Sequence, residues 1–155
     1  MDLVRIAALV AILSSGVVYG TDVFCALVQR PALAHVDDRA LTAVMGNLHR
    51  YGDRRMPIPG ALGIVAAATC AALAAVTGRW IPAVAAATAV ALLLSWIVLY
   101  MRVSAPINRT LTAAVTSGEV PVNVRVLQGD WDRIITARAV LQGVAVAALC
   151  LALVA

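Results

Sequence analysis

Four long apolar runs divide the chain, and each is long enough to cross a lipid bilayer. They cover about residues 3–28, 58–76, 80–101 and 134–155. A transmembrane α-helix needs roughly 20 predominantly apolar residues, because that length matches the thickness of the hydrocarbon core. Four such runs use more than half of the chain and leave no room for a separate soluble domain. The pattern predicts an all-α integral membrane protein, a four-helix bundle with a single transmembrane domain over residues 1–155.

The first apolar run is expected to be a membrane span and not a cleaved signal peptide. It begins almost at the N-terminus and continues past Val17 to Leu27, which is longer than the apolar core of a signal peptide. Pro31 is expected to end this helix, because proline breaks a helix interior. Gly16 and Gly20 form a pair of small residues four apart, which predicts the close approach of another helix at this point.

A short amphipathic helix is predicted between the first two spans, over Arg39–Tyr51. Asp37 or Asp38 precedes it and is a typical N-cap residue. Its apolar residues recur with the spacing i, i+3, i+4, i+7 of one helical face: Leu41, Val44, Met45 and Leu48. Such a helix is expected to lie on the membrane surface or to fold under the bundle.

The connection between the third and fourth spans is expected to be partly helical. The sequence Ser104-Ala105-Pro106 predicts a break after the third span, followed by a short helix that ends near Val115. Residues 118–130 are expected to form a loop.

The charged residues are few and unevenly placed. Hydrophobic residues make up 63% of the chain and charged residues 13%, and every one of the twelve cations is an arginine. Ten of them lie in the two long connections or just inside the fourth apolar run: Arg30, Arg39, Arg50, Arg54, Arg55, Arg102, Arg109, Arg125, Arg133 and Arg138. By the positive-inside rule, both long connections are expected in the cytoplasm and both termini outside. The absence of lysine and the excess of alanine indicate GC-rich bacterial coding, so we expect a bacterial inner membrane.

The same residues exclude several functions. The arginines are scattered and form no basic stripe with interleaved aromatic residues, which argues against nucleic-acid binding. Cys25, Cys70 and Cys150 are far apart, and the only histidines, His35 and His49, have no metal-ligand spacing. We therefore expect neither a metal site nor a bound cofactor.

Asp22 and Arg138 are the two charges that lie inside apolar runs apart from Arg5, which is at the start of the first run. Asp22 is about 12 Å of helix from Arg30, and Arg138 is about one turn into the fourth span, so both are expected at similar depth on the cytoplasmic side. A buried ion pair is the simplest way to tolerate both. Each also belongs to a polar stripe, with Tyr19 on the first helix and with Gln142 on the fourth. Two interpretations stay open: an interhelical hydrogen-bond seam, or a cavity in which these side chains bind substrate.

Two further polar residues could serve a cavity on that side. His49 falls at the edge of the apolar face of the amphipathic helix, and histidine is the natural proton acceptor near neutral pH. Asn108 follows the third span closely and could cap a helix or donate a hydrogen bond to a substrate oxygen.

Three short motifs occur in order around the four spans. Arg30-Pro31-Ala32-Leu33 follows the glycine-containing first span, Pro106-Ile107-Asn108 follows the third span, and Trp131 precedes Arg138 by seven residues. With these motifs the chain resembles, over essentially its whole length, the anthrone oxygenase-like family of small four-helix membrane proteins. The resemblance implies oxidation of anthrones to anthraquinones by molecular oxygen with no evident cofactor.

That chemistry needs an apolar slot, a base and hydrogen-bond donors for an enolate oxygen. His49 or Asp22 is the candidate base, and Asn108, Trp131 and Arg138 are the candidate donors. The expected partners are a hydrophobic small molecule and the lipid bilayer, and self-association into a homo-oligomer is left open. The alternative is a non-enzymatic membrane protein, either an accessory subunit or a binder of a lipid or other hydrophobic ligand, in which Asp22 and Arg138 only stabilise the bundle.

Overall fold

The computed structural model describes residues 2–155, and every regular element in this range is helical. Four helical segments are long and apolar enough to cross a membrane: Leu3–Leu33, Pro57–Val76, Trp80–Ser117 and Val124–Val154. The predicted all-α class with four membrane-length helices is confirmed.

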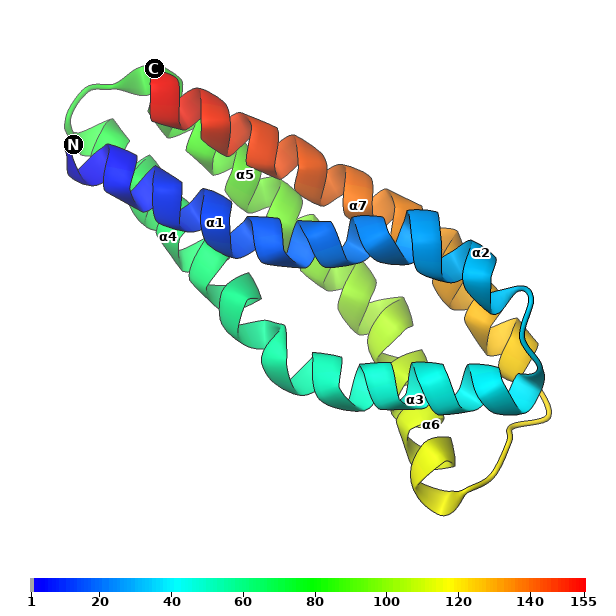
Figure 1. Ribbon diagram of the computed structural model, residues 1–155. Helices are drawn as coiled ribbons and strands as arrows, with labels where there is room; N and C mark the ends of the chain where they lie inside the picture. The colour runs from blue at the N-terminus through cyan, green and yellow to red at the C-terminus, as the bar shows by residue number, and fades with distance from the viewer. Residues whose placement is uncertain (1) are drawn as a thin grey trace.

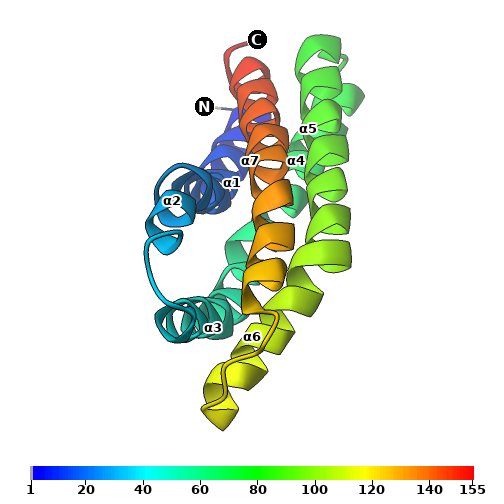
Figure 2. The same ribbon diagram turned by 90° about the vertical axis from the view of Figure 1, so that its right-hand side faces the viewer.

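The elements follow one another with short connections. In chain order they are α1 (Leu3–Phe24), the π-helical turn η1 (Cys25–Gln29), α2 (Arg30–Leu33), α3 (Asp38–Arg55), α4 (Pro57–Val76), α5 (Trp80–Leu99), the π-helical turn η2 (Tyr100–Ser104), α6 (Ala105–Ser117) and α7 (Val124–Val154). Helices α1, α4, α5 and α7 lie side by side, and both termini lie at one end of this group (Figure 1). Helices α3 and α6 pack against each other at the opposite end (Figure 2).

The prediction that Pro31 ends the first helix is wrong, as is the predicted break at Pro106. The helices continue through both prolines, to Leu33 and Ser117. A proline has no N–H to donate, and its ring clashes with the carbonyl one turn earlier. A π-helical turn ends two residues before each proline, and this wider turn accommodates the ring.

The loop expected over residues 118–130 is much shorter. Gly118 closes α6 with a left-handed φ of 74°, and α7 already begins at Val124. The first turns of α7 carry Gln128 and Trp131, which are polar or amphipathic but buried. Packing of these side chains against the other helices keeps this stretch helical.

The N-cap of α3 and half of its predicted apolar face are found in the structure. The Asp37 carboxylate accepts a hydrogen bond from the backbone N–H of Ala40 at 2.7 Å and caps the helix. Leu41 and Met45 are fully buried, whereas the other two residues of the expected apolar face, Val44 and Leu48, are about half exposed. The buried face is therefore turned toward the side that carries His49.

Glycine permits close helix contacts, but not where the sequence predicted them. A Cβ atom added to Gly16 or Gly20 would meet nothing within 4 Å, so the predicted close approach at this pair is wrong within the chain. The close approach of α1 is instead to Gly63 of α4, where an added Cβ would lie 2.5 Å from the Ser15 hydroxyl. At Gly46, where α3 meets α6, it would lie 2.5 Å from the Leu111 carbonyl oxygen.

The buried apolar side chains form two separate hydrophobic cores, one toward each end of the protein. The core nearer the termini is built mainly from alanine, and the core at the other end from larger side chains. Along α7 the core of larger side chains ends at Ile135, and the alanine-rich core begins at Ala145. Arg138 and Gln142 lie between them. Asp22 lies between the two cores along α1 in the same way. The buried polar residues thus gather in a layer between two apolar cores.

Candidate functional site

A cavity of about 620 Å³ opens in this polar layer. Residues from α1, α3, α4, α5, α6, α7 and both π-helical turns line it. Its volume is in the range of pockets that bind small molecules. Phe24, Leu48 and Tyr51 line the cavity and are each about half exposed, so the cavity has a mouth at the surface beside these residues of α1 and α3.

The Asp22–Arg138 ion pair forms one wall of the cavity. Arg138 Nη2 lies 2.8 Å from Asp22 Oδ1, and both side chains are at least nine-tenths buried. Asp22 Oδ2 also accepts hydrogen bonds from Trp96 Nε1 at 3.1 Å and from Gln142 Nε2 at 2.6 Å. The predicted pair is confirmed, and three donors satisfy its carboxylate.

Aromatic rings surround the guanidinium group of Arg138. Its Cζ atom lies 5.5–5.8 Å from the ring centroids of Trp96, Tyr100 and Trp131. Nη1 donates a hydrogen bond to the Ser104 hydroxyl at 2.7 Å, whereas the buried Nε has no partner. The faces of aromatic rings attract cations, so this cage stabilises the charge where water is excluded.

A second acid, Asp53, holds a hydrogen-bond network that includes Tyr100, one of the rings around Arg138. Its Oδ1 atom accepts hydrogen bonds from the Tyr100 hydroxyl and from Asn108 Nδ2, each at 2.9 Å. Asn108 Oδ1 in turn accepts a hydrogen bond from Trp131 Nε1 at 3.1 Å. One carboxylate on α3 thereby fixes side chains of η2 and α6, and through Asn108 it also fixes an indole of α7.

His49 is buried beside this network, on the same helix as Asp53. It lines the cavity, its ring lies 5.6 Å from that of Trp131, and its Nε2 atom has no hydrogen-bond partner. Burial lowers the pKa of His49 to about 4; the Asp53 carboxylate opposes this shift and Arg138 adds to it. His49 is therefore neutral at pH 7 and keeps a free lone pair or N–H at Nε2.

The structure brings most of the predicted site residues together. His49, Asp22, Asn108, Trp131 and Arg138 all line the cavity. The two remaining residues, Tyr19 and Gln142, are outside its lining. The Tyr19 ring lies against α7, where a Cβ atom on Gly143 would be 3.1 Å from it. Gln142 is fully buried behind Asp22. For these two residues the seam interpretation describes the geometry better than substrate contact.

Four residues of the site were missed by sequence reasoning: Asp53, Trp96, Tyr100 and Ser104. A signal was present in the spacing, because Trp96, Tyr100, Ser104 and Asn108 recur every four residues along α5, η2 and α6. Asp53 likewise follows His49 by four residues on α3. Such spacing places side chains on one helical face, but it does not tell which face meets a cavity.

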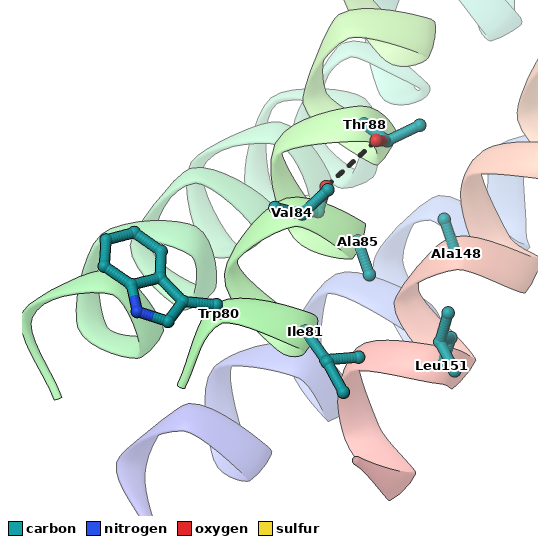
Figure 3. A pocket seen from close by; sticks show the side chains of 7 residues that line it. All are labelled: Trp80, Ile81, Val84, Ala85, Thr88, Ala148 and Leu151. Atoms are coloured by element: carbon teal, nitrogen blue, oxygen red, sulfur yellow. Dashed lines mark hydrogen bonds between the residues drawn. The ribbon is translucent and has the colours of Figure 1, made fainter. Parts of the chain in front are cut away.

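A second hollow lies near the termini and carries little chemistry. This groove of about 520 Å³ runs between α5 and α7 (Figure 3). Its lining residues are Trp80, Ile81, Val84, Ala85, Thr88, Ala148 and Leu151. The Thr88 hydroxyl donates a hydrogen bond to the Val84 carbonyl oxygen within its own helix at 2.9 Å. The groove is therefore an apolar surface remote from the polar layer.

Among residues 2–155, no three His, Cys, Asp or Glu side chains gather closely enough to hold a metal ion.

Comparisons of the chain with protein-family models, with curated proteins and with solved structures find no match.

Proposed function

We propose that this chain is a membrane-embedded oxidoreductase of the anthrone oxygenase-like type, acting on a hydrophobic aromatic substrate with molecular oxygen. The observation that carries the proposal is the unpartnered, buried His49 on the wall of a cavity that also contains Arg138. A base without a hydrogen-bond partner and a nearby cation are the two groups that enolate formation requires.

The base in this proposal is His49 and not Asp22. Both oxygens of Asp22 already accept hydrogen bonds, from Arg138, Trp96 and Gln142. The role of Asp22 is to position Arg138. His49 is unprotonated at neutral pH, because burial holds its pKa near 4. An enolate that forms beside it would raise this pKa by charge attraction and so favour proton transfer.

The donors for the enolate oxygen come from Arg138 and Asn108. Arg138 keeps a buried Nε–H without an acceptor. Asn108 uses one of its two amide N–H groups for Asp53, which leaves the second for a ligand. Trp131 acts through Asn108, to which its indole N–H is bonded.

The overall reaction balances without a further oxidant. His49 removes a proton from the methylene carbon between two aromatic rings, and the resulting enolate passes one electron to oxygen. The carbon radical and superoxide then form a C–O bond, and the peroxide takes the proton back. Loss of water leaves a ketone. The carbon loses four electrons, one oxygen atom stays in the ketone, and the other leaves as water.

The position of the cavity mouth suits a substrate that enters from lipid. Phe24, Leu48 and Tyr51 at the mouth are apolar or aromatic and about half exposed. A flat aromatic compound dissolved in the bilayer could pass between α1 and α3 without crossing water.

Anthrone turnover with oxygen consumption in chelator-treated membranes tests this proposal. His49→Ala should lower kcat on the order of 10²–10⁴-fold, the usual effect of losing a general base. Asn108→Ala and Trp131→Phe should each cost roughly 10–10³-fold, and His35→Ala is the matched control because His35 is exposed. Loss of wild-type activity on chelation, or full activity of His49→Ala, would refute the mechanism.

A second candidate function is a non-enzymatic binder of a lipid or other hydrophobic ligand. The observation that favours it is that both carboxylate oxygens of Asp22 already accept hydrogen bonds from Trp96, Arg138 and Gln142. Such a network is expected of a purely structural polar layer as well as of a catalytic site. A wild-type protein that turns over no anthrone, yet retains a hydrophobic molecule detected by mass spectrometry after purification, would favour this candidate.

The proposed setting is a four-helix bundle in a bacterial inner membrane, with α3 and α6 at its cytoplasmic face and both termini outside. The support is the arginine asymmetry: ten arginines belong to the connections and the span end on one side. A cysteine introduced at Ser117 in a variant lacking the three native cysteines should resist labelling from outside intact cells, whereas one added after Ala155 should react. Labelling at Ser117 would overturn this orientation.

A further inference from the structure

A third hollow, which we call the basic groove, lies between α3 and α6. Its volume is about 560 Å³, and three arginines line it: Arg50 and Arg54 from α3 and Arg109 from α6. Arg50 and Arg54 are one helical turn apart and therefore share a face. The groove also includes His49 and Asp53, so these two residues form the wall between it and the site cavity.

Three arginines and one aspartate line the basic groove, so it keeps a net positive charge. Among residues 2–155, Arg50, Arg54 and Arg109 form no salt bridge, whereas Arg79, Arg125, Arg133 and Arg138 each do. The only acid in the lining is Asp53, whose Oδ1 atom is occupied by Tyr100 and Asn108. The hydroxyls of Thr116 and Ser117 donate to backbone carbonyls, so the arginines supply the free donors.

From the lengths of the membrane-spanning helices, we expect the groove near the level of the lipid phosphates. Helices α4 and α5 have 20 residues each, which corresponds to about 30 Å of helix and to the thickness of the hydrocarbon core. Arg54 precedes the first residue of α4 by three positions, and Arg109 follows the last residue of α5 by ten. The groove therefore starts at the headgroup level, at the end of the protein that holds α3 and α6 (Figure 2).

We propose that the basic groove binds the phosphate of an anionic membrane lipid. Guanidinium groups match phosphate oxygens in charge and in fork geometry, and basic pockets beside membrane helices recognise anionic headgroups. The bound phosphate would join Arg50 and Arg54 of α3 to Arg109 of α6. The groove shares His49 and Asp53 with the site cavity, but the proposed lipid site uses none of the donors assigned to the substrate.

Native mass spectrometry of the purified protein in neutral detergent tests the site, with dioleoylphosphatidylglycerol and dioleoylphosphatidylcholine as probes. The wild type should bind the anionic lipid on the order of tenfold more tightly than the zwitterionic lipid. The triple variant R50Q/R54Q/R109Q should lose this preference. The matched control R30Q/R39Q/R102Q removes the same charge from exposed arginines outside the groove and should keep it.

The possible outcomes distinguish a lipid site in the groove from nonspecific attraction by the total positive charge and from binding of soluble phosphate. Equal loss of preference in both triple variants, or its retention in R50Q/R54Q/R109Q, would overturn the proposal. If that variant fails to fold, R109Q alone should still lower the preference, and an unchanged value would count against the site. Inorganic phosphate should not raise the melting temperature of the wild type above a chloride control of equal ionic strength; a rise absent from the groove variant would assign the site to soluble phosphate instead.

Discussion

Asp22 on α1 and Arg138 on α7, 116 positions apart in the sequence, form an ion pair of 2.8 Å in the polar layer between the two apolar cores. Only 4% of the Asp22 side chain and 7% of the Arg138 side chain are exposed. Removing two charges from water is costly, and hydrogen bonds to Trp96, Gln142 and Ser104 offset part of this cost. Each charge is therefore tolerated only in the presence of the other.

Loss of either member of this pair should destabilise the protein strongly. Asp22→Ala or Arg138→Ala leaves an uncompensated buried charge, which costs about 3–5 kcal/mol of unfolding free energy. The double variant Asp22→Asn/Arg138→Gln should recover part of the loss, because no charge remains. Unfolding in detergent measures both effects. Arg133→Ala, which breaks the exposed pair with Asp130 on the same helix, is the control and should cost less than about 1 kcal/mol. Strictly additive effects at Asp22 and Arg138 would contradict the coupling.

The stability of the protein should fall as the pH is lowered through the titration of His49. The unfolded histidine has a pKa near 6.5, whereas burial lowers the pKa of His49 to about 4 in the folded protein. Between these values the unfolded chain binds a proton that the folded chain does not, so the unfolding free energy decreases as pH falls. The full difference is on the order of 3 kcal/mol and is reached below pH 4.

Melting curves between pH 4 and 8 of the wild type, His49→Gln and His35→Gln measure this contribution. His49→Gln should show a flatter profile than the wild type, because glutamine does not titrate. His35 is exposed, and its replacement should leave the wild-type profile unchanged. Parallel profiles for the wild type and His49→Gln would show that His49 is not buried in its neutral form.

Asp53 should hold the site together although it is not assigned to substrate. Asp53→Asn replaces two charge-assisted hydrogen bonds, from Tyr100 and Asn108, by weaker neutral ones or by a donor clash. The expected loss is on the order of 1–3 kcal/mol of stability, with a fall in anthrone turnover because Asn108 and Trp131 lose their fixed orientation. Unfolding and turnover of Asp53→Asn and of the control Asp130→Asn, whose side chain is 44% exposed, check this. Equal unfolding free energies and equal turnover in the two variants would show that the Asp53 network contributes neither to stability nor to the orientation of the site.

Two glycines on α4 should respond oppositely to a single added methyl group. At Gly63 an added Cβ lies 2.5 Å from Ser15 Oγ and 3.2 Å from the Ser15 backbone nitrogen, so Gly63→Ala must turn the Ser15 hydroxyl and shift α1 by a few tenths of an ångström. Overpacking of this kind costs about 1–3 kcal/mol. At Gly60 the nearest atoms are 3.9 Å away on Trp96, and Gly60→Ala should be neutral or stabilising, because alanine favours the helix. Similar melting temperatures for both variants would contradict the close contact of α1 and α4.

The sequence determined the class of the protein and one of its central contacts. The length and hydropathy of each apolar run are local properties, and the cost of placing each residue in lipid is largely independent of the rest of the fold. Four membrane-length helices could therefore be predicted from the sequence. The pairing of Asp22 with Arg138 was also predictable, because both lie at a similar depth and neither charge is tolerated alone in an apolar environment. An N-cap at Asp37 or Asp38 was predictable for a similar reason, since a cap depends on only three or four neighbouring residues, and the structure selects Asp37.

Only the tertiary structure decided which side chains face the cavity. The rotation of each helix follows from packing against several neighbours, and it turns Tyr19 and Gln142 away from the cavity while it brings Asp53 and Tyr100 to its wall. The close approach of α1 at Gly63, and not at Gly16 or Gly20, depends on the same packing. Sequence spacing gives the face on which a residue lies, but the identity of the helix that covers this face is set by long-range contacts.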